Sequence, residues 1–351
     1  MTASRTLEPT YTQNIDDIAE KVYAGQRLTA EDGLRLFRYP NLPELASLAH
    51  YVREKLHPDT NHLVTYIVGR NINYTNVCWV RCKFCAFYRV PGHEEGYVLS
   101  KEQIFEKIQQ MVDLGGIEIL MQGGLNPKLK IEWYEDLLAS IKERFGRYGV
   151  ILHAFSPAEL IYIARISKLS LAEMFARLKR AGLDSVPGGG AEILTDRVRE
   201  TISPYKDTAD AWLNCMREAH RAGIRSTVTM MYGSVDTIED RVEHLIRARA
   251  LQDETGGFTA FIPWSFQPDG TELPGIERAS AFDYLRTVAV SRLMLDNIPH
   301  MQASWVTQGP KIAQIALRYG LNDFGSTMME ENVVSSAGCA FTMPIEEIER
   351  L

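Results

Sequence analysis

Two hydrophobic patterns alternate along most of the chain. In the first, a few apolar residues follow one another without interruption, which is typical of strands buried on both faces. In the second, apolar residues recur every three or four positions, as on one face of a helix. Several helical segments open with a capping box, as at Ser100/Gln103 and Ser170/Glu173. The uninterrupted runs predict eight strands, at residues 63–74, 117–122, 150–155, 185–187, 226–232, 258–263, 301–306 and 323–327.

Strands that alternate with amphipathic helices favour parallel pairing in a sheet that helices cover. Eight such units predict an α/β fold, a closed (β/α)8 barrel of the TIM type. The first 60 residues show only the helical pattern, with one helix around residues 15–22 and another over residues 43–56. The predicted domains are therefore an N-terminal helical extension, residues 1–60, and a barrel, residues 61–351.

Composition and charge argue against several classes of protein. Apolar residues make up 45% of the chain and charged residues 24%, which is ordinary for a globular protein. The net charge of −7, without a run of five or more Lys and Arg, argues against nucleic acid and anionic membrane as partners. The chain has no run of 18 apolar residues for a membrane span, and its polar first twelve residues do not resemble a signal peptide.

The cysteines indicate a metal site rather than disulfides. Their number, five, is odd, and Cys78, Cys82 and Cys85 lie within eight positions. Such crowding is typical of metal ligands in a reducing compartment, so we expect a cytoplasmic protein. Cys215, in a helical stretch, and Cys339, near the C-terminus, are expected to be bystanders.

The three crowded cysteines have C-x3-C-x2-C spacing on a loop after the first predicted strand. Three thiolates on so short a loop can ligate three irons of a [4Fe–4S] cluster and leave the fourth iron open to another ligand. Arg81 and Lys83 lie between them and can stabilise the anionic thiolates. Four aromatic residues can shield the cluster from water: Trp79, Phe84, Phe87 and Tyr88.

Two other interpretations of the cysteines stay open. Together with His93 they can form a structural Cys3His zinc site, although the eight residues from Cys85 to His93 are an unusual spacing for zinc. Such a chain would be a non-catalytic barrel that binds a metabolite. The cysteines can also be three free thiols.

Barrels of this type place their chemistry at the C-terminal ends of the strands. In this chain those ends are rich in polar and glycine residues, which packing alone does not explain. They carry Gln122, Gly123, Gly124, His153, Ser156, Gly188, Gly189, Gly190, Glu192, Tyr232, Gly233, Trp264, Gln302, Ser304, Trp305, Gln308, Glu330, Glu331 and Asn332.

Several of these residues have both a functional and a structural interpretation. The glycine turn at 122–124 lets a ligand approach the backbone, or simply reverses the chain. Glu192 contacts a ligand, or favours the N-terminus of the next helix. His153 is a general base with a pKa near neutrality, or a hydrogen-bonded strand-end histidine. Ser156 contacts a cofactor or caps the next helix, and Glu159 is a further acid/base candidate on that helix.

The cysteine loop after a first barrel strand, followed by aromatic residues, resembles the radical S-adenosylmethionine superfamily. The resemblance implies that S-adenosylmethionine binds the open iron through its methionyl group, and that its reductive cleavage yields a deoxyadenosyl radical. It also implies that the turn at 122–124 binds the methionyl amino group and that Glu192 contacts the ribose. Tyr88 and Ser156 are further candidates for cofactor contacts.

Longer stretches resemble one family within it, the cyclic dehypoxanthine futalosine synthases of menaquinone biosynthesis. Two sister families, aminofutalosine synthase and F0 synthase, share the architecture, but Asn71, Tyr74 and the Thr307-Gln308 pair favour the cyclase. The matching stretches are residues 70–78, 119–125, 153–157, 187–192, 261–264, 302–309 and 322–328.

The resemblance implies a reaction and its partners. The radical takes the hydrogen at C4′ of dehypoxanthine futalosine, the new carbon radical adds to the substrate's own benzoate ring, and loss of an electron and a proton restores aromaticity. The protein must hold the ring over C4′ and accept the proton, for which His153 is the first candidate and Glu192 the second. An external electron donor such as flavodoxin or ferredoxin is expected.

Overall fold

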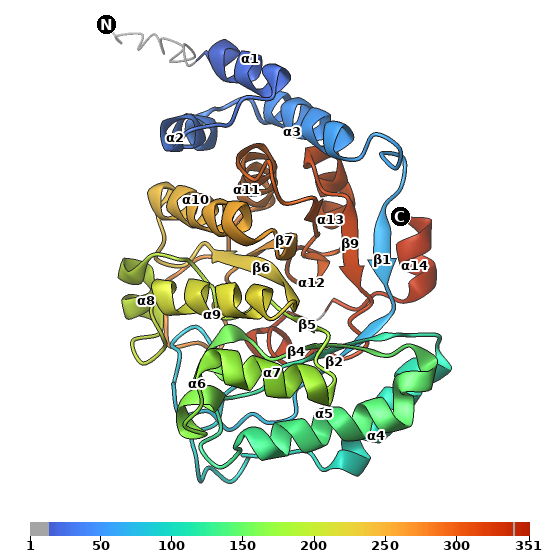
Figure 1. The fold of residues 1–351 in the computed structure, drawn as a ribbon. Coiled ribbons are helices and arrows are strands. Elements are labelled where there is room, and N and C mark those ends of the chain that lie inside the picture. Colours follow the sequence, from blue (N-terminus) through green and yellow to red (C-terminus); the bar gives the residue numbers. More distant parts are fainter. Residues whose placement is uncertain (1–13, 340) are drawn as a thin grey trace, which may run out of the picture.

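Parallel strands form the wall of a barrel in the computed structural model of the chain, which describes residues 14–339 and 341–351 (Figure 1). Seven strands pair in the order β2-β3-β4-β5-β6-β7-β8. Their bounds are β2 Gly69–Ile72, β3 Glu118–Met121, β4 Ile151–Ala154, β5 Ser185–Val186, β6 Arg225–Tyr232, β7 Phe258–Ser265 and β8 His300–Met301. The other two, β1 (Thr65–Ile67) and β9 (Asp323–Ser326), pair with each other in parallel.

Two sets of contacts link the seven-stranded sheet to the β1–β9 pair. β1 and β2 are successive parts of one extended segment, so the pairing of β1 with β9 brings the last strand beside the first. A parallel backbone bridge between Gln302 and Asp323 joins β9 to the segment that leaves β8. The wall thus has eight positions, with the β1–β2 segment counted once, and each overlaps one predicted strand. The predicted parallel α/β barrel is confirmed.

The seventh predicted strand, residues 301–306, is wrong over most of its length. β8 ends early, and the chain turns into a short helix, α12 (Trp305–Gln308). Trp305 is buried, and its indole N–H donates a hydrogen bond to the Ser326 carbonyl at 3.1 Å. A tertiary contact with β9 therefore holds this segment, although its apolar residues resemble those of a strand.

Helices cover the outer face of the barrel (Figure 1). Their bounds are α4 Lys101–Asp113, α5 Ile131–Phe145, α6 Pro157–Ile166, α7 Leu171–Ala181, α8 Asp196–Ile202, α9 Ala209–Arg221, α10 Ile238–Thr255, α11 Ala281–Met294, α13 Pro310–Ala316 and α14 Ile345–Arg350. Both predicted capping boxes are present, because Ser100 and Ser170 each accept a hydrogen bond from the N–H three residues on. None of the helices in the described ranges is long and apolar enough to cross a bilayer.

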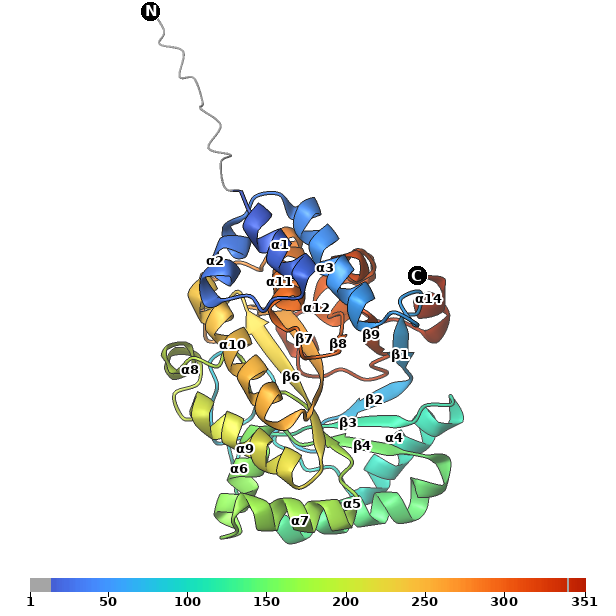
Figure 2. The same ribbon diagram turned by 45° about the horizontal axis from the view of Figure 1, so that its top comes forward.

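Three helices precede the barrel: α1 Asp16–Ala24, α2 Ala30–Arg38 and α3 Leu42–Leu56. The two helices expected from hydrophobic spacing are confirmed, and α2 is an addition whose start is marked by a capping box between Thr29 and Asp32. α2 and α3 pack on α10 and α11, so these helices lie against one side of the barrel (Figure 2). The domain boundary at residue 60 stays a prediction, and residues 1–13 lie outside the described residues.

Candidate functional site

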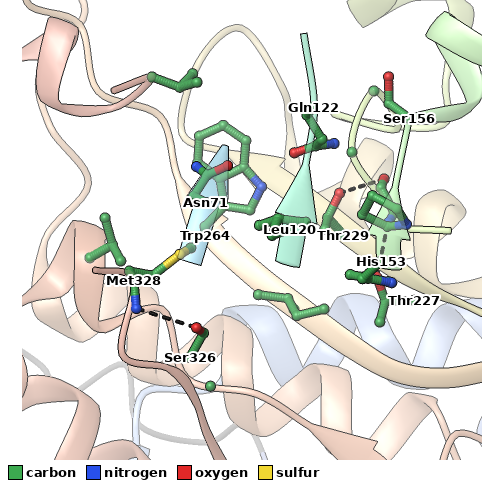
Figure 3. A pocket seen from close by; sticks show the side chains of 18 of the residues that line it. Asn71, Leu120, Gln122, His153, Ser156, Thr227, Thr229, Trp264, Ser326 and Met328 are labelled. Atoms are coloured by element: carbon green, nitrogen blue, oxygen red, sulfur yellow. Dashed lines mark hydrogen bonds between the residues drawn. The ribbon is translucent and has the colours of Figure 1, made fainter. Parts of the chain in front are cut away.

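The barrel interior contains a cavity of about 950 Å³, which the cysteine loop borders at the C-terminal ends of the strands. Barrel interiors are usually filled by bulky branched side chains. Here polar residues occupy inward positions among apolar ones, which is typical of a ligand-binding cavity. Figure 3 shows several of these polar side chains: Asn71, Gln122, His153, Thr227 and Thr229.

The cavity brings together every residue that the sequence proposed for metal, cofactor or proton transfer. They are Cys78, Cys82, Cys85, Tyr88, Gln122, Gly123, Gly124, His153, Ser156, Glu159 and Glu192. Among the described residues, some other strand-end residues do not line the cavity: Tyr232, Gln308, Glu330 and Asn332. Glu330 instead pairs with Arg70 at 2.7 Å and with Lys107 at 2.6 Å.

Backbone hydrogen bonds anchor the cysteine loop. The Cys78 N–H donates to the Arg89 carbonyl, and the Lys83 N–H to the Ile202 carbonyl, each at 2.8 Å. All three thiols are free, and burial raises their pKa values, that of Cys82 to about 12. A coordinating metal deprotonates such thiols outright. Three free thiols facing one cavity fit an iron–sulfur cluster, in which each thiolate ligates a different iron.

The geometry does not support the zinc alternative. His93 lies in an exposed turn, where its Nδ1 accepts a hydrogen bond from the Glu95 N–H at 3.1 Å. Donors to one zinc ion lie within about 2.3 Å of it, so they must converge. Within residues 14–339 and 341–351, no three His, Cys, Asp or Glu side chains are grouped so as to hold one metal ion.

Lys206 is a cation that acts on all three thiols and that the sequence analysis did not identify. The Lys206 side chain is buried on the loop after α8 and forms an ion pair with Glu192. Its charge opposes the burial that raises the pKa of Cys82. Arg81, by contrast, is exposed. Sequence analysis missed Lys206 because it lies neither at a strand end nor within a motif.

Glu192 presents a buried carboxylate to the cavity beside a fixed positive charge. It is 3% exposed and adopts a left-handed backbone conformation, with φ of 44°. α8 begins only at Asp196, so the interpretation of Glu192 as a helix N-terminal residue is wrong. The preceding turn is fastened to β6, because the Thr229 hydroxyl donates to the Gly188 carbonyl at 2.7 Å.

Glu159 holds the glycine turn that follows β3. Its carboxylate accepts hydrogen bonds from the Gly123 N–H (3.0 Å), the Tyr74 hydroxyl (2.7 Å), and the N–H and hydroxyl of Ser156 (2.8 and 2.7 Å). Both oxygens are thus occupied, which favours a structural role for Glu159. Ser156 caps α6 and also lines the cavity. A Cβ at Gly124 would lie 2.4 Å from a backbone oxygen before the cysteine loop, so only glycine fits there.

His153 occupies an inward position on β4, in register with Leu120 of β3 and Ser185 of β5. Its Nδ1 lies 2.7 Å from the Ser185 hydroxyl oxygen. Burial lowers the pKa of His153 to about 4, so the expectation of a pKa near neutrality is wrong. A neutral imidazole retains one acceptor nitrogen and can still take up a proton.

Tyr88 and Trp305 complete the part of the wall that the sequence identified. The Tyr88 hydroxyl donates to Glu272 at 2.7 Å, and burial together with that carboxylate raises the pKa of Tyr88 to about 12. Tyr88 therefore remains a protonated donor near the thiols. Trp305, one of the strand-end residues identified from the sequence, lines the cavity.

Two family models match the chain in succession. Residues 72–248 match that of the Radical SAM superfamily, and residues 255–350 match that of the CofH/MqnC C-terminal region. The two matches cover the cysteine loop, most of the strands and the C-terminal segment.

Named relatives match nearly the whole chain. A cyclic dehypoxanthine futalosine synthase from Halalkalibacterium halodurans is 48% identical, over 96% of this chain and 90% of the relative. An aminodeoxyfutalosine synthase from Thermus thermophilus is 42% identical, over 92% of this chain and 86% of the relative. The crystal structure of methylornithine synthase (PylB) matches with a TM-score of 0.71 and 20% identity, over 90% of this chain and 88% of that one, which shows a shared fold.

Proposed function

Because the chain belongs to the Radical SAM superfamily, we propose that it converts dehypoxanthine futalosine to cyclic dehypoxanthine futalosine in menaquinone biosynthesis. It is an enzyme of the group that carries the CofH/MqnC C-terminal region. The observation that carries the proposal is the 48% identity to a synthase of that name over 96% of the chain. The cavity supports it, because thiols, a neutral imidazole and a buried ion pair border this one cavity.

The family implies a [4Fe–4S] cluster and S-adenosylmethionine as cofactors. In our proposal Cys78, Cys82 and Cys85 ligate the cluster. Glu192 and the turn at 122–124 contact S-adenosylmethionine, with Tyr88 and Ser156 as further contacts. When bound, the two cofactors supply a carbon-centred radical that abstracts a hydrogen atom from the substrate.

The chain's own residues bind, orient and deprotonate the substrate. The barrel wall excludes water from the reactive species, and its inward side chains hold the substrate ring against its own ribose. After ring closure, one electron must pass to a one-electron acceptor and one proton must leave the ring. His153 is the first candidate for the proton acceptor, because its imidazole is neutral. Glu192 is the second, because its carboxylate is already paired with Lys206.

The proposal includes an external reductant, such as flavodoxin or ferredoxin, and a cytoplasmic location. Both follow from the chemistry, because a reduced iron–sulfur cluster needs a low-potential electron donor and a reducing compartment.

Anaerobic assays with alternative substrates test the proposed function. Reconstituted protein is incubated with S-adenosylmethionine, a reductant and, in separate reactions, the substrates of the cyclase, of aminofutalosine synthase and of F0 synthase. Mass spectrometry should detect a cyclised product two hydrogens lighter than dehypoxanthine futalosine, together with deoxyadenosine. Turnover of a sister substrate alone would reassign the chain to that sister reaction. A colourless protein without iron would contradict the radical mechanism.

A further inference from the structure

One amide in the barrel wall has an oxygen without a hydrogen-bond partner. Asn71 is 4% exposed and lines the cavity, and its Oδ1 is buried without a partner among the residues that the structure describes. Asn73, two residues later, is a contrast. Its Nδ2 donates to the Gln122 carbonyl at 3.2 Å, and its Oδ1 accepts from Asn332 at 3.2 Å. A buried acceptor without a donor costs free energy, so such a group in a cavity wall calls for an explanation.

Apolar and aromatic residues line the same cavity as Asn71. It pairs in register with Leu120 of β3, which in turn pairs with His153 of β4, so the three residues lie at one level of the wall. Trp264 and Met328 line the same cavity, as Figure 3 shows. The cavity wall therefore combines a free carbonyl oxygen and an imidazole with flat and flexible apolar surfaces.

We propose that the Asn71 side chain positions the substrate by accepting a hydrogen bond from a ribose hydroxyl, a role that rests on the proposed function. A free carbonyl oxygen requires a donor. The benzoate carboxylate of the substrate only accepts hydrogen bonds when ionised, whereas a sugar hydroxyl donates. The Asn71 oxygen thus suits a sugar hydroxyl and not the ionised carboxylate, and the apolar surfaces of the wall suit the aromatic ring.

The assignment places the ribose at the level of His153. The hydrogen atom leaves the ribose and the proton leaves the ring that folds onto it, so an anchor on the sugar orients both reacting parts. Asn71 acts on the substrate and not on the cofactors. Its replacement should therefore affect substrate affinity while S-adenosylmethionine affinity and cluster iron remain unchanged.

The test compares Asn71→Leu with the matched control Asn73→Leu in the anaerobic holoenzyme. Asn71→Leu keeps the side-chain size and removes the amide, so the Kd for dehypoxanthine futalosine should rise about 10- to 100-fold. Its melting temperature without substrate should be unchanged or higher, because an unpaired buried acceptor is gone. Asn73→Leu breaks two hydrogen bonds and should lower the melting temperature.

Substrate analogues that lack one ribose hydroxyl identify the donor. One analogue should bind the wild-type enzyme about as weakly as the full substrate binds Asn71→Leu. The affinity of this analogue for Asn71→Leu should be little lower than its affinity for the wild type. If every analogue loses as much affinity for Asn71→Leu as for the wild type, the proposed hydrogen bond is overturned. A lower melting temperature with unchanged substrate Kd would make Asn71 structural and also overturn it. Failure of the proposed function is distinct, because wild-type enzyme would then neither bind nor convert dehypoxanthine futalosine.

Discussion

Two buried groups of charged residues follow the strand ends of this barrel, and they differ in what they face. The ion pair of Glu192 and Lys206 has side-chain exposures of 4% and 8%, and both residues line the cavity. The second group centres on Arg241 and Asp236, with side-chain exposures of 9% and 0%. Neither of these two is among the described residues that line the cavity.

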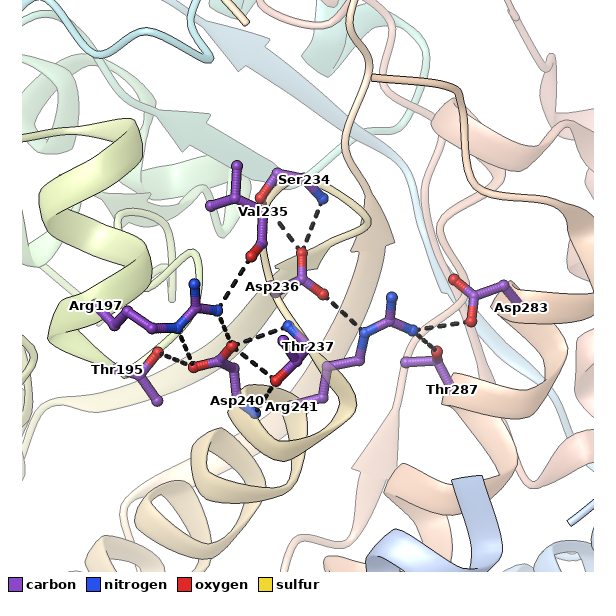
Figure 4. Close-up of polar contacts among 10 residues, drawn as sticks. All are labelled: Thr195, Arg197, Ser234, Val235, Asp236, Thr237, Asp240, Arg241, Asp283 and Thr287. Atoms are coloured by element: carbon purple, nitrogen blue, oxygen red, sulfur yellow. Dashed lines mark hydrogen bonds and ion pairs between the residues drawn. The ribbon is translucent and has the colours of Figure 1, made fainter. Parts of the chain in front are cut away.

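In the second group the charged side chains form hydrogen bonds and ion pairs with one another, as Figure 4 shows. Arg241 donates to Asp236 at 2.8 Å, to Asp283 at 2.9 Å and to Thr287 at 3.1 Å. The other oxygen of Asp236 accepts from the Ser234 N–H at 2.8 Å. This group ties the segment before α10 to α11. The comparison shows that buried charge alone does not mark a candidate site, and that the first pair is a candidate because it faces the cavity.

The strongest test of the comparison is at the thiols next to the first ion pair. Cys78→Ala, Cys82→Ala and Cys85→Ala should each remove most cluster iron and abolish deoxyadenosine formation, since in the proposed site each thiolate ligates its own iron. Iron analysis and product mass measure both effects. Cys215→Ala, a buried thiol on α9 outside the cavity wall, is the control and should change neither. Full activity of any of the first three variants would contradict the assignment of these cysteines as cluster ligands.

Replacement of His153 should separate two steps at the cavity. His153→Gln should still cleave S-adenosylmethionine and transfer deuterium from substrate C4′ to deoxyadenosine. The cyclised product should fall about 10²–10⁴-fold, the usual contribution of a general base. Because the His153 pKa is about 4, wild-type activity should fall only as the pH drops towards 4, and should show no histidine limb near pH 6.5. Loss of deuterium transfer in the variant would instead give His153 an earlier role.

The second group should affect folding and not chemistry. Arg241→Met leaves the fully buried Asp236 carboxylate without its ion-pair partner, so the free energy of unfolding should fall by about 3–5 kcal/mol. Chemical denaturation of the holoprotein measures the loss. Cluster iron and S-adenosylmethionine affinity of the folded variant should match the wild type. If the variant folds with normal stability but no longer binds S-adenosylmethionine, the second group is not purely structural and the distinction between the two groups is wrong.

The smallest expected effect is at the cavity ion pair itself. Glu192→Gln should weaken S-adenosylmethionine binding by about 1–3 kcal/mol, the contribution of a hydrogen bond to a charged group, with the cluster intact. Equilibrium dialysis of the anaerobic protein measures this affinity. If affinity is unchanged and product formation is lost, Glu192 is the proton acceptor instead.

Local patterns determined much of this protein from its sequence alone. Strand and helix periodicity predicted the parallel barrel, because inward and outward positions repeat at fixed intervals along each element. Cysteine spacing predicted the metal site, because ligands on one short loop are close in space by connectivity. The order of the strands then placed the ends that carry Gln122, His153 and Glu192 around one cavity.

Other properties depend on residues that only the folded chain brings together. Lys206 pairs with Glu192 and acts electrostatically on the thiols from a loop without a motif, and the last barrel position closes through the bridge between Gln302 and Asp323. The low pKa of His153 arises from burial, which the residues next to it in the sequence do not reveal. The same holds for the unpaired oxygen of Asn71, because Asn73 has the same chemistry two positions away and finds partners. Burial and hydrogen bonding depend on contacts between distant segments, so the tertiary structure alone decided them.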